Sequence, residues 1–304
     1  MIEVNLLGTG GMLPLPERYL TSLYVKYKGC VILIDCGEGT QVAIRAAGLG
    51  FKQIGVICLT HFHADHIAGL PGLLLTIGNS GRTEPLVIIG PKYVRHIVEC
   101  LCVIAPQLPY ELQFAEISET ETDREILAID SLTISAQPVE HWIPCYAYRF
   151  DLSRQGRFNP EKAKSLEIPV KYWSVLQSGK TVNANDMIFT PSDVMGEARK
   201  GISVCYATDL RPSNSLSEFA KCSDLFICEG MYGDSEMIEK AVEHRHCLFA
   251  EAAEMAKNAA VKELWLTHFS PAMMKPDEYI NNATDIFPNT KVDKKREILI
   301  FDED

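Results

Sequence analysis

The sequence predicts an α/β protein. Its 304 residues are 47% hydrophobic, enough to bury a large core within one domain. Short uncharged runs rich in β-branched residues, such as Ile54–Leu59, are typical of buried strands. Several such runs end at a histidine or an aspartate, and α/β proteins commonly hold their sites at the carboxyl ends of strands. No repeat or low-complexity linker divides the chain, so we expect a single domain over residues 1–304.

The predicted elements follow one another along the whole chain. Strands are expected at Ile2–Leu7, Val31–Ile34, Ile54–Leu59, Leu132–Ala136, Gly201–Thr208 and Lys262–Thr267. The run Leu132–Ala136 alternates with period two, and Leu210-Arg211-Pro212 forms a turn after Gly201–Thr208. Helices are expected at about Ile97–Ile104 and Ala250–Ala256, and a turn at Gly156 leads into a short third helix.

The segment Thr60–His66 packs three histidines and one aspartate directly after a predicted strand. Its spacing allows His61 and His63 to reach one metal ion, whereas Asp65 and His66 face a second. Imidazole and carboxylate ligands suit zinc best, and manganese or iron are also compatible. The alternatives are a histidine-rich surface loop or a closed structural zinc site, although structural zinc usually recruits cysteines.

Three more candidate ligands each follow a predicted strand: His141, Asp209 and His268. Taken singly, each is an ordinary polar residue at a strand end. Taken together with Thr60–His66, they predict one shared site.

These motifs resemble the metallo-β-lactamase superfamily and, within it, the ribonuclease Z family of endonucleases, which mature the 3′ ends of tRNA. The resemblance covers nearly the whole chain and rests on Leu6–Gly11, Thr21-Ser22, Val31–Gln41, Thr60–Leu73 and Leu266–Ser270. It implies a four-layer αββα sandwich, with two mixed sheets face to face and helices outside.

The resemblance also implies a ligand set. One zinc ion would be held by His61, His63 and His141, the other by Asp65, His66 and His268, and Asp209 would bridge them. Two-metal hydrolytic sites hold their ions roughly 3.5 to 4 Å apart, activate a water molecule and neutralise charge on the attacked phosphate. Asp65 is the expected acceptor of the water's proton.

A general acid is expected at His246, where the family has a histidine that assists at the scissile phosphate. Glu229 is a candidate to orient it. The alternative is a histidine at a helix start and a carboxylate at a strand end, both without a catalytic role. We expect His96 and His244 to be ordinary surface residues.

Three departures from the family pattern concern the positioning of substrate rather than metal. Pro16 stands where the family often has a lysine in its Pro-x-Lys-x-Arg loop. The family's Gly-Asp-Thr is replaced by Thr208-Asp209-Leu210, and Cys247-Leu248 replaces Ser-Thr after the predicted general acid.

An arm that grips the tRNA body is the second feature of the family, and residues 149–182 are the candidate here. This stretch has seven basic and three acidic residues, a local charge of +4 against −11 for the chain. Charges act over roughly 8 to 10 Å at ordinary salt, so a basic arm can bind RNA on an acidic protein. Tyr172 and Trp173 are candidates for stacking on nucleotides. Where the family commonly has Gly-Pro after Ile-Pro, Ile168-Pro169 is followed here by Val170-Lys171-Tyr172-Trp173. The alternative is a basic excursion that packs on the core or on another subunit.

The ten cysteines predict a reducing compartment. They form no spaced framework, and most lie in or beside apolar strands, where reduced and buried thiols are common. The amino terminus reads as a strand rather than a leader, and no apolar run is long enough to span a membrane. We therefore expect a cytoplasmic protein, and the resemblance implies a homodimer.

Three functions remain open from the sequence. The first is a metal-dependent endonuclease that cuts precursor tRNA near its 3′ end. The second is a related hydrolase of a small phosphodiester or ester, with the same metals and no use for the arm. The third, a non-catalytic RNA-binding protein, is disfavoured because a binder has no need of seven metal ligands.

Overall fold

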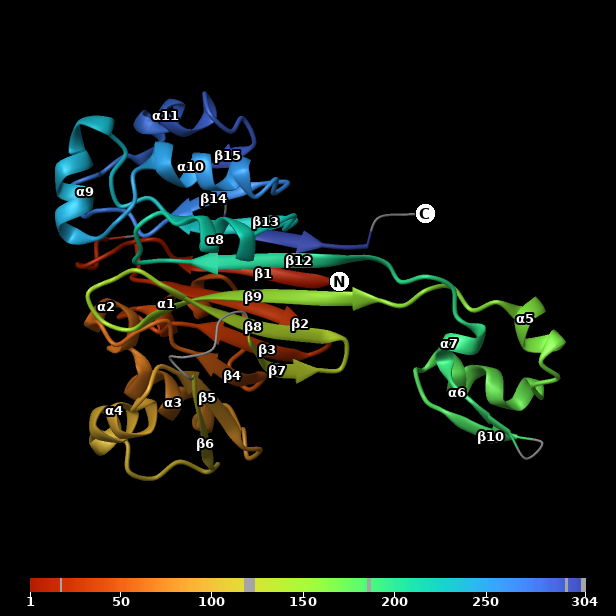
Figure 1. The fold of residues 1–304 in the computed structure, drawn as a ribbon. Coiled ribbons are helices and arrows are strands. Elements are labelled where there is room, and N and C mark those ends of the chain that lie inside the picture. Colours follow the sequence, from red (N-terminus) through yellow and green to blue (C-terminus); the bar gives the residue numbers. More distant parts are fainter. Residues whose placement is uncertain (17, 118–123, 185–186, 293–294, 302–304) are drawn as a thin grey trace. The chain divides into compact units, whose positions relative to one another are not determined.

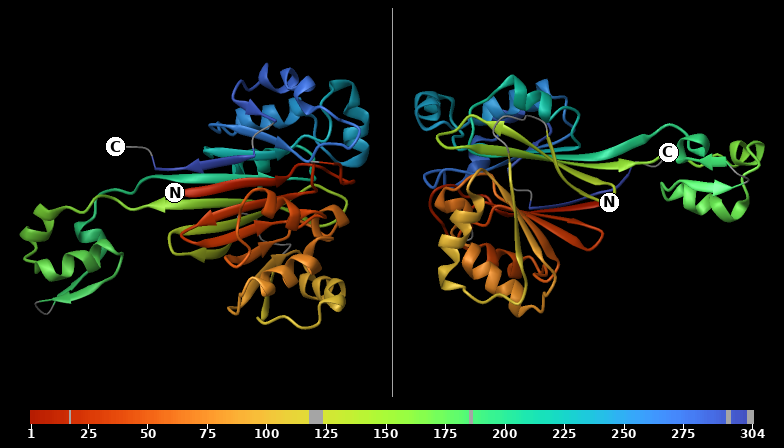
Figure 2. Two further views of the ribbon diagram at one scale, coloured as in Figure 1. Left: turned by 180° about the vertical axis from the view of Figure 1, so that it is seen from behind. Right: turned by 60° about the horizontal axis from the view of Figure 1, so that its bottom comes forward.

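Two mixed β-sheets lie face to face in the larger of two compact units (Figure 2), which comprises Met1–Asp151 and Ile202–Ile300. The structure is a computed structural model that describes residues 1–16, 18–117, 124–184, 187–292 and 295–301. Helices cover the outer face of each sheet (Figure 1). The larger unit therefore has the four layers that the sequence predicts.

The first sheet has the strand order β16-β1-β2-β3-β4-β5-β6 among the described residues. Its strands are β1 Ile2–Gly8, β2 Ser22–Tyr27, β3 Cys30–Ile34, β4 Ile54–Cys58, β5 Leu86–Gly90, β6 Leu112–Glu116 and β16 Arg296–Leu299. The helices of this half are α1 Thr40–Ala46, α2 Ala64–Ile67, α3 Leu70–Asn79 and α4 Val94–Leu101, which continues into η1 Cys102–Ile104. Parallel pairing sets Ile34 opposite Cys58, so the carboxyl ends of β3 and β4 are level.

The second sheet has the order β15-β14-β13-β12-β9-β8-β7 within the described part of the chain. Its strands are β7 Arg124–Ile129, β8 Leu132–Val139, β9 Cys145–Arg154, β12 Arg199–Ala207, β13 Leu225–Glu229, β14 Leu264–Thr267 and β15 Thr290–Lys291. Its helical segments are α8 Asn214–Phe219, η3 Ser235–Met237, α9 Ile238–His244, α10 Phe249–Asn258, η4 Pro276–Tyr279 and α11 Asn281–Thr284. Strands β12 to β15 are parallel, which brings their carboxyl ends to one edge.

The interior of the larger unit is apolar. Helix α10 buries Phe249, Ala252 and Ala256 in one cluster with Phe226 and Leu266 of the sheet beneath it. Burial of apolar surface contributes about 25 cal/mol per Å², so this face is the reason that α10 docks.

Strand β9 ties the two sheets together beside the Thr60–His66 segment. The Tyr148 hydroxyl donates to the Leu59 carbonyl at 2.7 Å, and the Tyr146 amide donates to the Thr60 carbonyl at 3.1 Å. Both tyrosines are buried. The loop after β4 is thus fixed against the second sheet as well as its own.

Among the described residues, the smaller unit comprises Leu152–Gly201 and Phe301. It contains α5 Pro160–Ser165, η2 Val170–Tyr172, α6 Trp173–Gln177, the hairpin β10 Val182–Ala184 and β11 Met187–Phe189, and α7 Pro191–Val194. The Asn159 side chain caps α5, as the predicted turn and helix require, by accepting from the Lys162 amide at 3.0 Å.

The smaller unit also has a core of its own, in which Ile168 and Leu176 are buried. Most of the predicted arm, 149–182, falls within this unit, and its role as a projecting arm stays a prediction. Tyr172 and Trp173, the predicted stacking residues, pack against this core, and Trp173 Nε1 donates to the Ile168 carbonyl at 2.9 Å.

The cysteines are all free thiols, as predicted. Most are buried, but Cys222 is exposed because it lies in the turn between α8 and β13 rather than in a strand. Every helix in the described ranges is too short or too polar to cross a bilayer.

Candidate metal centre

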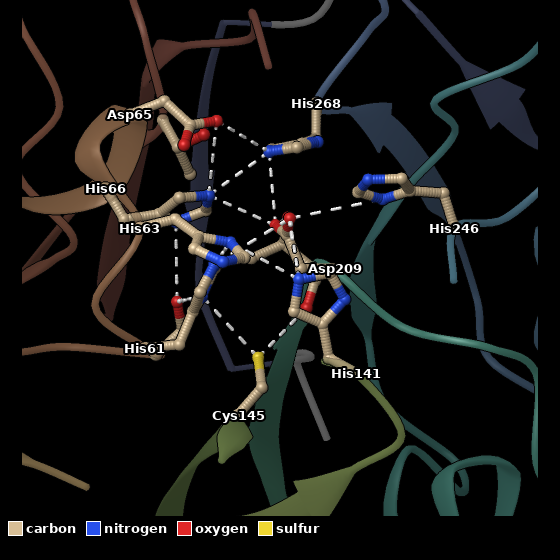
Figure 3. Close-up of polar contacts among 12 residues, drawn as sticks. His61, His63, Asp65, His66, His141, Cys145, Asp209, His246 and His268 are labelled. Carbon is tan, nitrogen blue, oxygen red and sulfur yellow. Dashed lines mark hydrogen bonds and ion pairs between the residues drawn. The ribbon is translucent and has the colours of Figure 1, made fainter. Parts of the chain in front are cut away.

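The predicted ligands converge at the edge where strands of both sheets end (Figure 3). His61, His63, Asp65 and His66 follow β4 and enter α2. His141 follows β8, Asp209 follows β12 and His268 follows β14. Side chains that are up to 207 positions apart along the sequence therefore meet, because the strands that they follow end at the same edge of the two-sheet sandwich.

One donor group consists of His61, His63, His141 and Asp209, whose ligand atoms all lie within 4.8 Å of one another. His61 Nε2 is 3.0 Å from His63 Nδ1, which is 3.4 Å from His141 Nε2. Asp209 Oδ1 lies 3.8 Å from both His61 Nε2 and His141 Nε2. Three nitrogen atoms and one oxygen thus surround a common point, as in a tetrahedral zinc site.

A second donor group consists of Asp65, His66 and His268. The Nε2 atoms of His66 and His268 are 3.2 Å apart, and Asp65 Oδ2 lies 3.6 and 3.4 Å from them. Asp209 Oδ2 is 3.1 Å from each of the same two nitrogens. Each carboxylate oxygen of Asp209 therefore faces a different donor group.

Two of the histidine nitrogens that point away from the cluster, on His61 and His66, have hydrogen-bond acceptors, whereas Nδ1 of His268 is buried without a partner among the described residues. His66 Nδ1 lies 2.7 Å from Asp35 Oδ2. The Thr60 hydroxyl donates to Asp35 at 2.8 Å, so its oxygen can accept from His61 Nδ1 at 3.0 Å. A proton on each of these Nδ1 atoms leaves a lone pair on Nε2, the arrangement that metal-binding histidines require. The donor chemistry therefore fits metal ions.

Local backbone conformation aims three of these side chains. Asp35, Asp209 and His268 have φ values of 57°, 55° and 56°, in the left-handed region that residues with a Cβ seldom adopt. Such strain is common where a functional site demands one orientation. Space is also limited, because a Cβ on Gly11 would lie 2.6 Å from Cε1 of His268.

The electrostatics of the cluster favour a positive charge. Burial lowers the pKa of His66, but the carboxylates of Asp209 and Asp35 outweigh it and raise that pKa well above its usual value. Burial raises the pKa of Asp209, yet His268, His66 and His61 hold it well below the usual range. Burial lowers the pKa of His61, His63 and His141, which keeps these imidazoles neutral, the state that binds metal.

His246 lies beside the cluster and pairs with Glu229. Its Nδ1 is 3.1 Å from Glu229 Oε2 and 4.0 Å from Asp209 Oδ1. Glu229 also accepts from the Leu210 and Cys247 amides, so it is fixed on the β12 side and on the α10 side. Burial lowers the pKa of His246, but Glu229 and Asp209 raise it overall to about 9.

Arg211 and Glu251 fix the segment that carries His246. The Arg211 guanidinium donates to the His246 carbonyl at 2.5 Å and to Glu251. Glu251 accepts from the Leu248 amide at 2.9 Å. The Glu251 side chain thus satisfies an amide at the start of α10, where the N-cap residue Leu248 has no polar side chain.

The cluster opens into a cavity of about 300 Å³. Its lining includes His63, Asp65, His141, Asp209, His246 and His268, together with Met12, Trp142, Tyr232 and His244. His244 is exposed, as predicted, but it is also part of this lining, which sequence reasoning missed. The place of Trp142 in the lining could have been suspected, because this aromatic residue directly follows the predicted ligand His141.

Arg18 is the arginine of the loop in which Pro16 stands in place of lysine. It forms hydrogen bonds to the main chain of this protein. Its Nη1 and Nη2 atoms donate to the carbonyls of Met273 and Met274, each at 2.8 Å. The loop is therefore attached to the segment after His268.

Comparisons with known proteins agree with this geometry. Residues 2–153 match the family model described as anti-Pycsar protein Apyc1. A ribonuclease Z of Agathobacter rectalis is 52% identical over 306 aligned positions, which cover 100% of both chains. Human tRNase Z, short form, superposes with a TM-score of 0.64 at 23% identity, over 90% of this chain and 94% of that one. The metallo-β-lactamase fold protein YhfI of Bacillus subtilis gives 0.64 at 19%, over 95% and 94%. The two solved structures confirm the predicted sandwich.

Proposed function

The chain belongs to the ribonuclease Z family, and on this premise we propose that it is a metal-dependent endoribonuclease that hydrolyses a phosphodiester at the 3′ end of precursor tRNA. The observation that carries the proposal is the position of Asp209, whose two oxygens face two separate donor groups beside an open cavity. A shared carboxylate between two metal sites suits phosphodiester hydrolysis.

We assign two zinc ions to the two donor groups. His61, His63 and His141 would hold one and Asp65, His66 and His268 the other, with Asp209 on both. Bound there, such ions lower the pKa of a water molecule and offset charge on the attacked phosphate. Manganese or iron would suit the same nitrogen and oxygen donors.

Asp65 is the residue proposed to take the proton of the attacking water. Its Oδ2 accepts from the Met12 amide at 2.7 Å, which fixes the carboxylate at the cavity wall. Hydrogen bonding and the imidazoles of His268 and His66 offset burial and hold the pKa of Asp65 below its usual range. The carboxylate is therefore ionised at neutral pH, and its proposed role as proton acceptor rests on its position in the cavity lining beside the donor groups rather than on this pKa.

His246 is proposed to protonate the leaving 3′ oxygen. Glu229 engages its Nδ1, so Nε2 is the nitrogen left to face the substrate. The side chain is part of the cavity lining. Glu229 acts through His246 and is a positioning residue.

The smaller unit is proposed to bind the tRNA body through its basic residues, among them Arg157, Lys162 and Lys171. We further propose a homodimer in a reducing, cytoplasmic compartment. The ten free thiols support the compartment.

Two substrates separate this function from hydrolysis of a small phosphodiester. Purified protein is incubated with a precursor tRNA and, separately, with bis(p-nitrophenyl) phosphate. The proposal predicts one endonucleolytic cut near the 3′ end of the tRNA. Cleavage of the small diester without cleavage of the tRNA would instead support the small-substrate hydrolase.

A further inference from the structure

We propose that Trp142 is a nucleobase-binding residue of the active site, on which the base of the nucleotide that carries the leaving 3′ oxygen stacks. The inference rests on the proposed endonuclease function and adds a base subsite to it. Trp142 directly follows the candidate ligand His141 and is part of the lining of the same cavity.

The indole is exposed, although it is a large apolar group. Trp142 keeps 60% of its surface accessible to solvent. The neighbouring segment His141–Pro144 lies between β8 and β9 and holds a ligand at one end. An aromatic ring that is exposed at the mouth of a polar cavity offers a flat apolar surface to whatever enters it.

Arg245 holds this ring in place. Its guanidinium carbon lies 4.4 Å from the centroid of the Trp142 ring, and its Nη1 donates to the His141 carbonyl at 2.7 Å. Arg245 ends α9 with a φ of 56°, so its own backbone direction is fixed. Arg245 thus restrains Trp142 by contacting the face of its ring and by its hydrogen bond to the preceding residue, His141. A ring that is already ordered loses little conformational entropy when a base stacks on it.

A nucleobase matches the chemistry of this wall better than a phosphate does. Trp142 carries no charge, and Tyr232 adds a second aromatic ring to the cavity lining. Base stacking on aromatic side chains tolerates any sequence, because every base has a flat face.

The nucleotide is assigned from the neighbours of the ring. Arg245, which stacks on Trp142, is adjacent in sequence to His246, the proposed donor to the leaving oxygen. The imidazoles of His141 and His246 are also close, with ring centroids 5.5 Å apart. The base next to Trp142 is therefore that of the nucleotide on the 5′ side of the scissile phosphate.

The test compares Trp142→Ala and Trp142→Phe with the wild type on precursor tRNA and measures the metal content of each protein. Loss of one stacked base corresponds to roughly 5- to 150-fold in kcat/KM. We expect that loss for Trp142→Ala on the tRNA, recovery in Trp142→Phe, and unchanged metal content in both variants. Tyr93→Ala is the control, because Tyr93 is also 60% exposed and lies outside the cavity lining.

Abasic substrates identify the base. With the base removed on the 5′ side of the cut, wild type and Trp142→Ala should cleave equally well, whereas removal on the 3′ side should leave their difference intact. A difference that survives removal of the 5′ base overturns the assignment, as does loss of metal from Trp142→Ala or conversion of the variant to a different oligomeric state. If wild-type protein cuts no tRNA, the proposed function itself fails, which is a separate result.

Discussion

Asp35 Oδ2 lies 2.7 Å from Nδ1 of His66, a residue 31 positions further along the chain, and both side chains are buried. Asp35 Oδ1 also accepts from the Thr60 amide at 2.8 Å. One carboxylate at the end of β3 therefore orients the first part of the motif that follows β4. It fixes His66 with Nε2 toward Asp209.

Replacing Asp35 by asparagine should weaken metal binding. The carboxylate of Asp35 has two acceptor oxygens, and the amide of asparagine has only one. In the variant, either Thr60 or His66 therefore faces the amide nitrogen and loses its acceptor. Loss of such a partner typically costs 10- to 100-fold in metal affinity. Competition with a chromogenic chelator measures it, and Asp130→Asn is the control, since Asp130 is exposed and pairs with Lys28. Unchanged affinity in Asp35→Asn would contradict the role given to Asp35.

Gly11→Ala tests the space around His268. The added Cβ would lie 2.6 Å from Cε1 and 2.7 Å from Nδ1 of the imidazole, so the ring must move. We expect a loss of about 1 to 3 kcal/mol in the unfolding free energy of the metal-loaded protein. Gly50→Ala is the matched control, because its Cβ meets nothing within 4 Å. Denaturant unfolding with and without a chelator provides the measurement, and equal behaviour of the two variants would refute the packing argument.

His246→Ala should separate substrates by their leaving groups. The ribose 3′ oxygen needs a proton as it leaves, whereas a nitrophenolate is stable as an anion. General acid catalysis contributes about 10²- to 10⁴-fold, so kcat on precursor tRNA should fall by that factor. The rate on bis(p-nitrophenyl) phosphate should change far less, with metal content retained. Equal losses on the two substrates would show that His246 does not act as the acid.

Arg157→Ala tests the smaller unit as an RNA-binding surface. Arg157 is exposed, and removing one phosphate contact should weaken binding and reduce the slope of log K against log salt by about one. Hydrolysis of the small diester should stay intact. Arg95→Ala is the matched control, because it also removes one positive charge, on α4 of the larger unit. Tight tRNA binding by Arg157→Ala with an unchanged salt slope would exclude the contact.

The strands and the clustering of the candidate ligands could be predicted from the sequence, because both leave local signals. The run Ile54–Leu59 became β4 almost to the residue, and the histidines after it were visible as a dense motif. The short helix after Gly156 also formed, since Asn159 and Pro160 mark its start.

What the sequence did not reveal depends on distant neighbours. Asp35 lies in Val31–Gln41, one of the segments that carry the resemblance, but its bond to His66 follows from the register of β3 on β4. Trp142 and Tyr232 line the cavity only because loops after β8 and β13 meet. Most cysteines were expected in or beside apolar strands, yet Cys222 is exposed in a turn.

Elemental analysis of Asp209→Ala is the most direct test of the metal centre. Wild-type protein, purified in active form and dialysed, should contain two transition-metal ions per chain, because each Asp209 oxygen faces its own donor group. The Asp209→Ala variant should lose metal and cleavage of precursor tRNA together, while circular dichroism shows that the fold is kept. Active wild-type protein without stoichiometric metal, or an Asp209→Ala variant with two ions and full activity, would contradict the account.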